Sequence, residues 1–238
     1  MEEILIQGFC LSAKPVAEHD QLLTIFTAEL GLLRIYARGI LRPQKKAWQL
    51  LARPASVSEL QLTRGRSELW NLVDGQLLYY PDGMNHSWEQ LQGILSMIRT
   101  ILDTQWLGKP APELMELLLA CTQQLASSYH PSLLALFYLK LLTYEGHFPF
   151  SLHCSACGEA CTENLHLDGQ ADVLCRAHAP PDALVIPMHI HEVWKIGSFL
   201  RSFQAIRAWE CPECALLERI MERMGTPRGS GFLGSSSS

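Results

Sequence analysis

The sequence predicts an α+β protein in which a small β-barrel is followed by a helical domain, and the helical domain carries a short cysteine-rich insertion. Two kinds of observation support this prediction. Hydrophobic residues recur with a period of two up to about residue 80 and with a helical period beyond it. Between the helical segments, cysteine and histidine side chains occur as two pairs whose members are three positions apart.

Residues 1–80 predict a five-stranded barrel. Five short segments are rich in β-forming residues and are separated by turns: ILIQGFCL, QLLTIFT, LLRIYAR, SELQLTR and SELWNLV. Five strands in about eighty residues suit a small closed barrel of the oligonucleotide-binding (OB) type. The sequence therefore predicts an OB-type domain here.

The third predicted strand has an outer face that suits single-stranded nucleic acid. Its period of two sends Leu33 and Ile35 to one face. The opposite face then carries Arg34, Tyr36 and Arg38. Proteins hold single strands with this combination, because cations follow the phosphates while an aromatic ring stacks on a base.

This strand lies in a basic segment of an acidic chain. The formal net charge is −5, whereas residues 34–66 contain eight cationic side chains against Glu59 alone. The total charge argues against a uniformly basic nucleic-acid binder but allows a local patch. A run of charge can also be an ordinary solvated surface. The predicted nucleic-acid-binding residues are Arg34, Tyr36, Arg38, Arg42, Lys45, Lys46, Arg64 and Arg66.

The helical domain is predicted in two parts, residues 81–150 and 181–225, and residues 226–238 have the composition of a disordered tail. Ser87 is a candidate N-cap, with Gln90 as its capping-box partner. The segment from Pro131 to the glycine at 146 is apolar nearly all round. This pattern predicts a helix at the centre of a bundle.

The insertion, residues 151–180, predicts a metal site. Cys154 and Cys157 form one pair, and Cys175 and His178 repeat the spacing after seventeen intervening residues. The pattern matches a zinc ribbon, in which two tight turns supply four ligands to one ion. Four protein ligands close the shell, so the predicted zinc is structural and stabilises a segment with few large apolar side chains. Rival ligands are His147, His153, Cys161, Cys211 and Cys214.

The remaining cysteine pair, Cys211 and Cys214 in CPEC, has three open interpretations. It can face the core, add a ligand to the zinc, or act in redox chemistry. A redox pair of the thioredoxin type would follow a strand of a parallel sheet, and the sequence predicts no such sheet here.

Sequence motifs of the common enzymes are absent. The chain contains no G-x-x-x-x-G-K-[ST] phosphate loop, no H-E-x-x-H and no G-x-S-x-G, so we predict no catalytic residue. No run of 18 apolar residues occurs, and the first residues are acidic where a secretory leader would be basic. We therefore expect a cytoplasmic protein that does not contact membranes.

Three stretches carry a resemblance to a known family. They are GFCLSAKPVAEHDQLLTIFTAELGLLRIYARGI in the barrel, ELWNLVDGQLL leading out of it, and YLKLLTYEGHFPFSLHCSACGE followed by DGQADVLCRAH. Over most of residues 4–180 the chain resembles the bacterial recombination mediator RecO. The resemblance implies an OB barrel, a helical domain and a zinc-binding insertion.

The resemblance also implies a function in DNA repair and recombination. Members of the family bind single- and double-stranded DNA and anneal complementary strands. With RecR they help to load recombinase onto DNA covered by single-strand-binding protein, which places the chain at the nucleoid. An apolar cleft rimmed by Arg99, Lys140 or Arg201 would accept the acidic, apolar-ended tail of single-strand-binding protein. Zinc-binding members commonly use four cysteines and DNA-binding members tend to be more basic, so His178 and the net charge depart from the pattern.

A second interpretation belongs to a different functional class. The chain can be a zinc-containing scaffold for protein interactions that binds DNA weakly or not at all. Binding of an oligonucleotide across a series of salt concentrations would distinguish the scaffold from the mediator.

Overall fold

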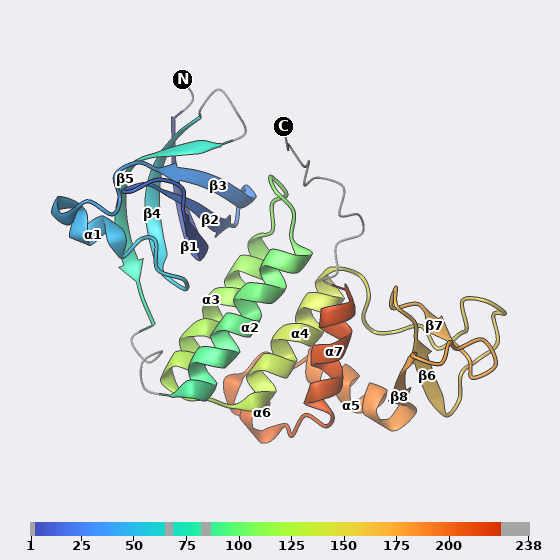
Figure 1. Ribbon diagram of the computed structural model, residues 1–238. Coiled ribbons are helices and arrows are strands. Elements are labelled where there is room, and N and C mark those ends of the chain that lie inside the picture. The colour runs from blue at the N-terminus through green and yellow to red at the C-terminus, as the bar shows by residue number, and fades with distance from the viewer. Residues whose placement is uncertain (1–2, 65–68, 82–86, 225–238) are drawn as a thin grey trace, which may run out of the picture. The chain divides into compact units, whose positions relative to one another are not determined.

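The computed structural model describes residues 3–64, 69–81 and 87–224 (Figure 1). The chain divides into two compact units, Met1–His130 and Pro131–Ser238. The first contains a five-stranded sheet and two long helices, and the second contains four helices and a three-stranded sheet, counted over the described residues. Strands followed by helices confirm the predicted α+β class.

The five strands of the first unit form a closed barrel in the order β1-β2-β3-β5-β4. Neighbouring strands are antiparallel except β3 and β5, which are parallel and pair only at Ile35 with Trp70 and at Tyr36 with Asn71. The first part of β3 therefore has an edge that β5 does not cover. The bounds are β1 Glu3–Pro15, β2 Gln21–Thr27, β3 Gly31–Ala37, β4 Val57–Arg64 and β5 Trp70–Tyr79.

The barrel interior is filled by the alternating apolar residues of its strands. On β3 the core contains Leu33 and Ile35, while Arg34 is exposed, and so is Arg38 directly after the strand, as the period of two predicted. Burying each large aliphatic side chain contributes about 1.5–3 kcal/mol, so this alternation fixes which face of β3 points outward. Two short helical turns between β3 and β4 were not predicted: η1 Pro43–Lys45 and α1 Lys46–Gln49.

Two helices, α2 (Trp88–Thr104) and α3 (Pro112–Ser127), complete the first unit. The predicted N-cap is confirmed, because the backbone N–H of Gln90 donates to Ser87 Oγ at 3.4 Å. The prediction that the Gln90 side chain completes the capping box at Ser87 is wrong. The Gln90 side chain donates to the carbonyl of Ala126 at 3.2 Å, since it is buried between the two helices and a buried amide needs a partner.

The loop that joins α2 to α3 is attached to the uncovered edge of β3. The Leu32 N–H donates to the Trp106 carbonyl at 3.4 Å, and the Gly108 N–H donates to the Leu32 carbonyl at 3.2 Å. Gly31 has φ +60°, and a Cβ there would collide with the Lys109 carbonyl, so glycine is required at this position.

The second unit is built around α4 (Pro131–Tyr144), which contacts α5 (Met188–Ser198), α6 (Phe203–Ala208) and α7 (Cys214–Met224). Ten of the fourteen residues of α4 are buried. The predicted central place of this helix is therefore confirmed within its own unit.

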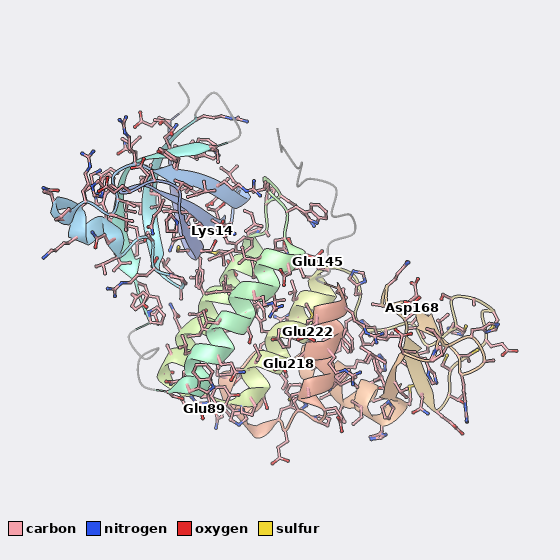
Figure 2. All side chains as sticks on the ribbon, viewed as in Figure 1. Lys14, Glu89, Glu145, Asp168, Glu218 and Glu222 are labelled. Atoms are coloured by element: carbon pink, nitrogen blue, oxygen red, sulfur yellow. The ribbon has the colours of Figure 1, made fainter. Side chains whose placement is uncertain are left out.

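A three-stranded sheet follows α4 in the order β7-β6-β8 (β6 Asn164–Leu167, β7 Val173–Leu174, β8 Leu184–Pro187). Asp168, labelled in Figure 2, organises the turn between β6 and β7, because its Oδ1 accepts from the N–H groups of Gln170 and Asp172 at 2.8 and 2.9 Å. β8 lies after residue 180, where the sequence ended the insertion, so the sheet extends beyond the predicted segment.

Beside this sheet, α5 buries a histidine. His191 is 2% exposed and lies against the rings of Phe148 and Phe150, with centroids 5.6 and 6.1 Å away. Neither ring nitrogen has a hydrogen-bond partner among the described residues, and Nδ1 lies 3.6 Å from the Glu192 carboxylate. Burial lowers the pKa of His191, Lys195 lowers it further, and the Glu192 carboxylate opposes the shift. The folded state therefore holds the neutral imidazole.

This burial predicts a pH dependence of stability. The unfolded chain takes up a proton at His191 as the pH falls through about 6.5, whereas the folded chain resists it. Stability from this group is complete above that pH and is lost below it. Thermal melting of wild type and His191→Leu from pH 8 to pH 5 should show a smaller decline in the variant. Equal declines would show that His191 is not the titrating group.

Candidate metal centre and nucleic-acid interface

The four predicted metal ligands converge at one point of the second unit. The ligand atoms of Cys154, Cys157, Cys175 and His178 all lie within 4.8 Å of one another. The Cys157 and Cys175 sulfurs are 3.9 Å apart, and Cys154 Sγ is 3.8 Å from His178 Nδ1. A tetrahedron with metal–sulfur bonds of about 2.3 Å has edges of about 3.8 Å. The cluster can therefore hold a tetrahedral metal ion.

Backbone turns place each pair of ligands. The Gly158 N–H donates to the Cys154 carbonyl at 2.8 Å, and the His178 N–H donates to the Cys175 carbonyl at 3.0 Å. Gly158 has φ +75°, which glycine adopts without strain. The Ser155 N–H donates to the Val173 carbonyl at 2.8 Å, so the first turn is fixed to β7 near the second pair.

The electrostatics of the cluster favour the thiolate form at Cys154 and Cys175, whereas burial and the neighbouring sulfurs raise the pKa of Cys157 to about 11. Hydrogen bonding from the Cys175 backbone lowers the pKa of Cys154 to about 6. A hydrogen bond with His178, at 3.1 Å, lowers the pKa of Cys175 and raises that of His178. Thiolate is the form of cysteine that binds metals, so the site is prepared for a cation.

The rival ligands lie outside this cluster in the described part of the chain. Cys161 is buried, and its sulfur faces the Leu174 carbonyl at 3.8 Å. Cys214, the first residue of α7, donates from its thiol to the Cys211 carbonyl at 3.3 Å. His147 and His153 are also outside the group.

The first unit presents a pocket beside its basic strand. This pocket, about 620 Å³ in volume, lies where β5 leaves the edge of β3 uncovered. Its rim carries two of the predicted cations, Arg34 and Arg64, and the Arg64 guanidinium is 5.8 Å from the Trp70 ring centroid. The other lining residues are Leu22, Leu32, Leu33, Leu69, Trp70, Leu107 and Gly108.

Asp20 anchors the predicted stacking residue. The half-buried Tyr36 donates a hydrogen bond from its hydroxyl to the Asp20 carboxylate, which also accepts from the Gly39 N–H at 2.7 Å. The bond with Tyr36 is the first cause that lowers the pKa of Asp20, and the charges of Arg38 and Arg42 add to it. The same bond raises the pKa of Tyr36. Tyr36 lies on the outer face as predicted, but its ring is held in place by an acid that the sequence did not reveal.

Comparisons with known proteins bear on this geometry. The model of the family described as Recombination protein O N terminal matches residues 1–80, which are those of the barrel. A DNA repair protein RecO from Chlamydia pneumoniae is 27% identical over 219 residues, covering 92% of this chain and 86% of the relative. These matches support membership of the RecO family.

Other relatives agree with this membership. A DNA repair protein RecO from Chlamydia muridarum is 25% identical over 205 residues, covering 86% of this chain and 87% of the relative. One from Desulfitobacterium hafniense is 30% identical over 156 residues, covering 63% of this chain and 54% of the relative. The similarity to RecO proteins therefore extends beyond the barrel.

The predicted interface residues fall into three groups. Arg34 and Arg64 share the pocket, and Arg38 and Arg42 surround Asp20. Lys46 is exposed on α1, while the Lys45 ammonium lies 3.7 Å above the Trp48 ring. Arg66 lies outside the described residues.

Among the helices that the structure describes, none combines the length and apolar character that crossing a membrane requires.

Proposed function

We propose that this chain is a DNA repair and recombination mediator that binds single-stranded DNA and anneals complementary strands. The observation that carries the proposal is the pair of exposed arginines on and just after β3, Arg34 and Arg38, beside the pocket rimmed by Arg34 and Arg64. A closed five-stranded barrel of the OB type commonly binds oligonucleotides, and the relatives are named DNA repair proteins. The barrel face is therefore our candidate DNA site.

Annealing by such a surface requires no catalytic residue. Two single strands repel each other through their phosphates, and bound arginines neutralise part of that charge. Base pairing then supplies the free energy of annealing. The proposed activity is non-enzymatic and takes place at the nucleoid in the cytoplasm, with RecR and recombinase as further partners.

The proposed resident cofactor is one structural zinc ion. Three cysteines and one histidine form a soft donor set with the sequence spacing of a zinc site, and their ligand atoms all lie within 4.8 Å of one another. A site with four protein ligands leaves no open position for substrate. The ion would stabilise the fold of the insertion instead of taking part in a reaction.

Binding and annealing by the wild-type chain test the proposal. Anisotropy of a labelled oligonucleotide, measured from low to physiological salt with protein of known zinc content, should show affinity that falls as salt rises. Complementary strands should anneal faster with protein than without it. Absence of binding even at low salt would overturn the mediator and leave the scaffold.

An exposed apolar pair supports a protein partner for the second unit. Ile196 and Phe199 are 63% and 73% exposed and lie one helical turn apart at the end of α5. Lys195 and Arg201 flank this pair in the sequence. An acidic tail with an apolar end, such as that of single-strand-binding protein, would match these charges and side chains.

The cations predicted to rim that cleft belong to different units. Arg99 lies in the first unit, where it is 3.7 Å from the Asp103 carboxylate. Lys140 and Arg201 lie in the second, and Lys140 Nζ donates to the Ser198 carbonyl at 3.2 Å. The proposed tail site therefore uses residues of the second unit only.

The tail site predicts a specific loss of affinity. Phe199→Ala should weaken binding of an acidic, phenylalanine-ended peptide by at least about 1 kcal/mol, because it removes a central aromatic side chain from the site. The control is Val185→Ala on β8, which is 45% exposed and belongs to the same unit. Calorimetry at low salt measures both. Unchanged affinity in Phe199→Ala would exclude this site, and binding of the peptide without any DNA binding would favour the scaffold.

A further inference from the structure

An exposed aromatic residue lies next to the basic strand. Trp106, in the loop between α2 and α3, is 68% exposed. A tryptophan side chain is large and mostly apolar, and exposing it forfeits a substantial hydrophobic gain. Single exposed apolar side chains are common on protein surfaces, so it is the position of Trp106 beside the basic strand that points to a ligand.

The backbone beneath Trp106 is fixed. Its carbonyl accepts from the Leu32 N–H of β3, and two residues later the Gly108 N–H donates to the Leu32 carbonyl. Farther along, the Ala111 N–H donates to the Ala28 carbonyl at 2.9 Å. The loop therefore continues the barrel surface, and its backbone hydrogen bonds hold Trp106 in a fixed position.

These hydrogen bonds place Trp106 beside the first of the β3 residues that point away from the barrel interior. Leu32, which is buried, Arg34 and Tyr36 alternate along that strand with the residues that fill the barrel, so successive members are about 6.6 Å apart. Trp106 is bonded beside Leu32, at the start of the row. Leu107, the next residue of the loop, lines the same pocket as Arg34 and Arg64. Aromatic and cationic groups thus follow one another from the loop onto the strand.

We propose that Trp106 is a base-stacking platform and that a single strand bound to β3 continues across the pocket onto this indole. The proposal rests on the proposed function and extends its site to a residue outside the barrel. A nucleotide fits the chemistry, because it combines an anion for Arg34 and Arg64 with a flat apolar base. The pocket volume is within the range that holds small ligands.

Trp106 is better placed for stacking than Tyr36. The tyrosine hydroxyl is engaged by Asp20 and its ring is half-buried, which limits how far it can turn toward a base. The indole of Trp106 is mostly exposed and has no comparable tether among the described hydrogen bonds. Stacking on it is independent of base identity, since every base has a π-face.

The test compares two tryptophans at opposite ends of one helix. Trp106→Ala should weaken binding of a labelled single strand by roughly 5-fold to 150-fold, with the dependence of affinity on salt unchanged, because no charge is removed. Trp88→Ala is the matched control. Trp88 is 70% exposed and begins α2, whose seventeen residues span about 25 Å. Its loss should leave affinity at the wild-type value.

Fluorescence gives a readout that loss of fold would not imitate. Indole emission of the wild type should be quenched when an unlabelled oligonucleotide binds, and Trp106→Phe should keep most of the affinity while losing the part of that quenching that Trp70, which also lines the pocket, does not supply. Wild-type affinity in Trp106→Ala, or equal losses in both alanine variants, would overturn the platform while leaving DNA binding intact. A wild type that binds no oligonucleotide would remove the proposed function itself. Weakening of an acidic peptide instead of DNA would assign the ring to a protein partner.

Discussion

Replacing Cys154 with serine is expected to release the metal ion and unfold the insertion. The wild-type protein, prepared without chelator, should contain one zinc ion per chain. Structural zinc contributes on the order of 10 kcal/mol to the folding of small zinc-dependent domains, and the sheet around this site is small. Elemental analysis measures the metal, and limited proteolysis should then cut within residues 151–187. Wild-type protein without any transition metal would remove the zinc site.

Variants of neighbouring residues identify the fourth ligand. His178→Ala should weaken metal retention against a chelator, because it removes one corner of the cluster. His178→Cys should retain the ion, since a thiolate is an equally suitable zinc ligand. Cys161→Ser is the control, as its sulfur faces the Leu174 carbonyl and lies outside the cluster. Metal lost from Cys161→Ser and kept by His178→Ala would show that the ligand assignment is wrong.

The sequence predicted the features that depend on neighbours in the chain. Alternation in β3 and the N-cap at Ser87 are local, because each is set by residues within one strand or one turn. The metal cluster was predictable for a related reason. Each pair of ligands lies within a single turn, so only the meeting of two turns, through Ser155 and Val173, was left to the tertiary structure.

Features that join distant segments were not predictable. The bond from Tyr36 to Asp20 spans sixteen residues, and the contact between Trp106 and Leu32 depends on where a helical hairpin meets a barrel edge. No spacing rule relates such positions. Gln90 shows the same limit, since its side chain has a local partner by motif but donates to Ala126 on a neighbouring helix. Because the Gln90 side chain is buried, it donates to the carbonyl it can reach on the neighbouring helix and not to its local capping-box partner.

The exposed arginines on and just after β3 are expected to bind phosphates, so replacing Arg34 and Arg38 together with alanine should weaken binding to every single-stranded sequence. Removing one phosphate interaction changes the slope of log affinity against log salt by about 0.7, so the slope should flatten by about 1.4. Tyr36→Phe should leave the slope nearly unchanged, because it keeps the ring and removes only the hydroxyl that binds Asp20. Anisotropy titrations at several salt concentrations, with melting temperatures beside them, distinguish weaker phosphate binding from lower stability of the fold.

The control must remove the same charge from another surface. Arg99→Ala with Arg219→Ala does so, because the first is an exposed residue of α2 paired with Asp103 and the second is exposed on α7. Long-range attraction to DNA depends on net charge, and both double variants lower it equally. A flattened slope in the β3 variant alone therefore assigns direct phosphate binding to β3. If that variant bound and annealed DNA like the wild type at every salt concentration, the barrel face would not be the DNA site, and the scaffold would become the better interpretation.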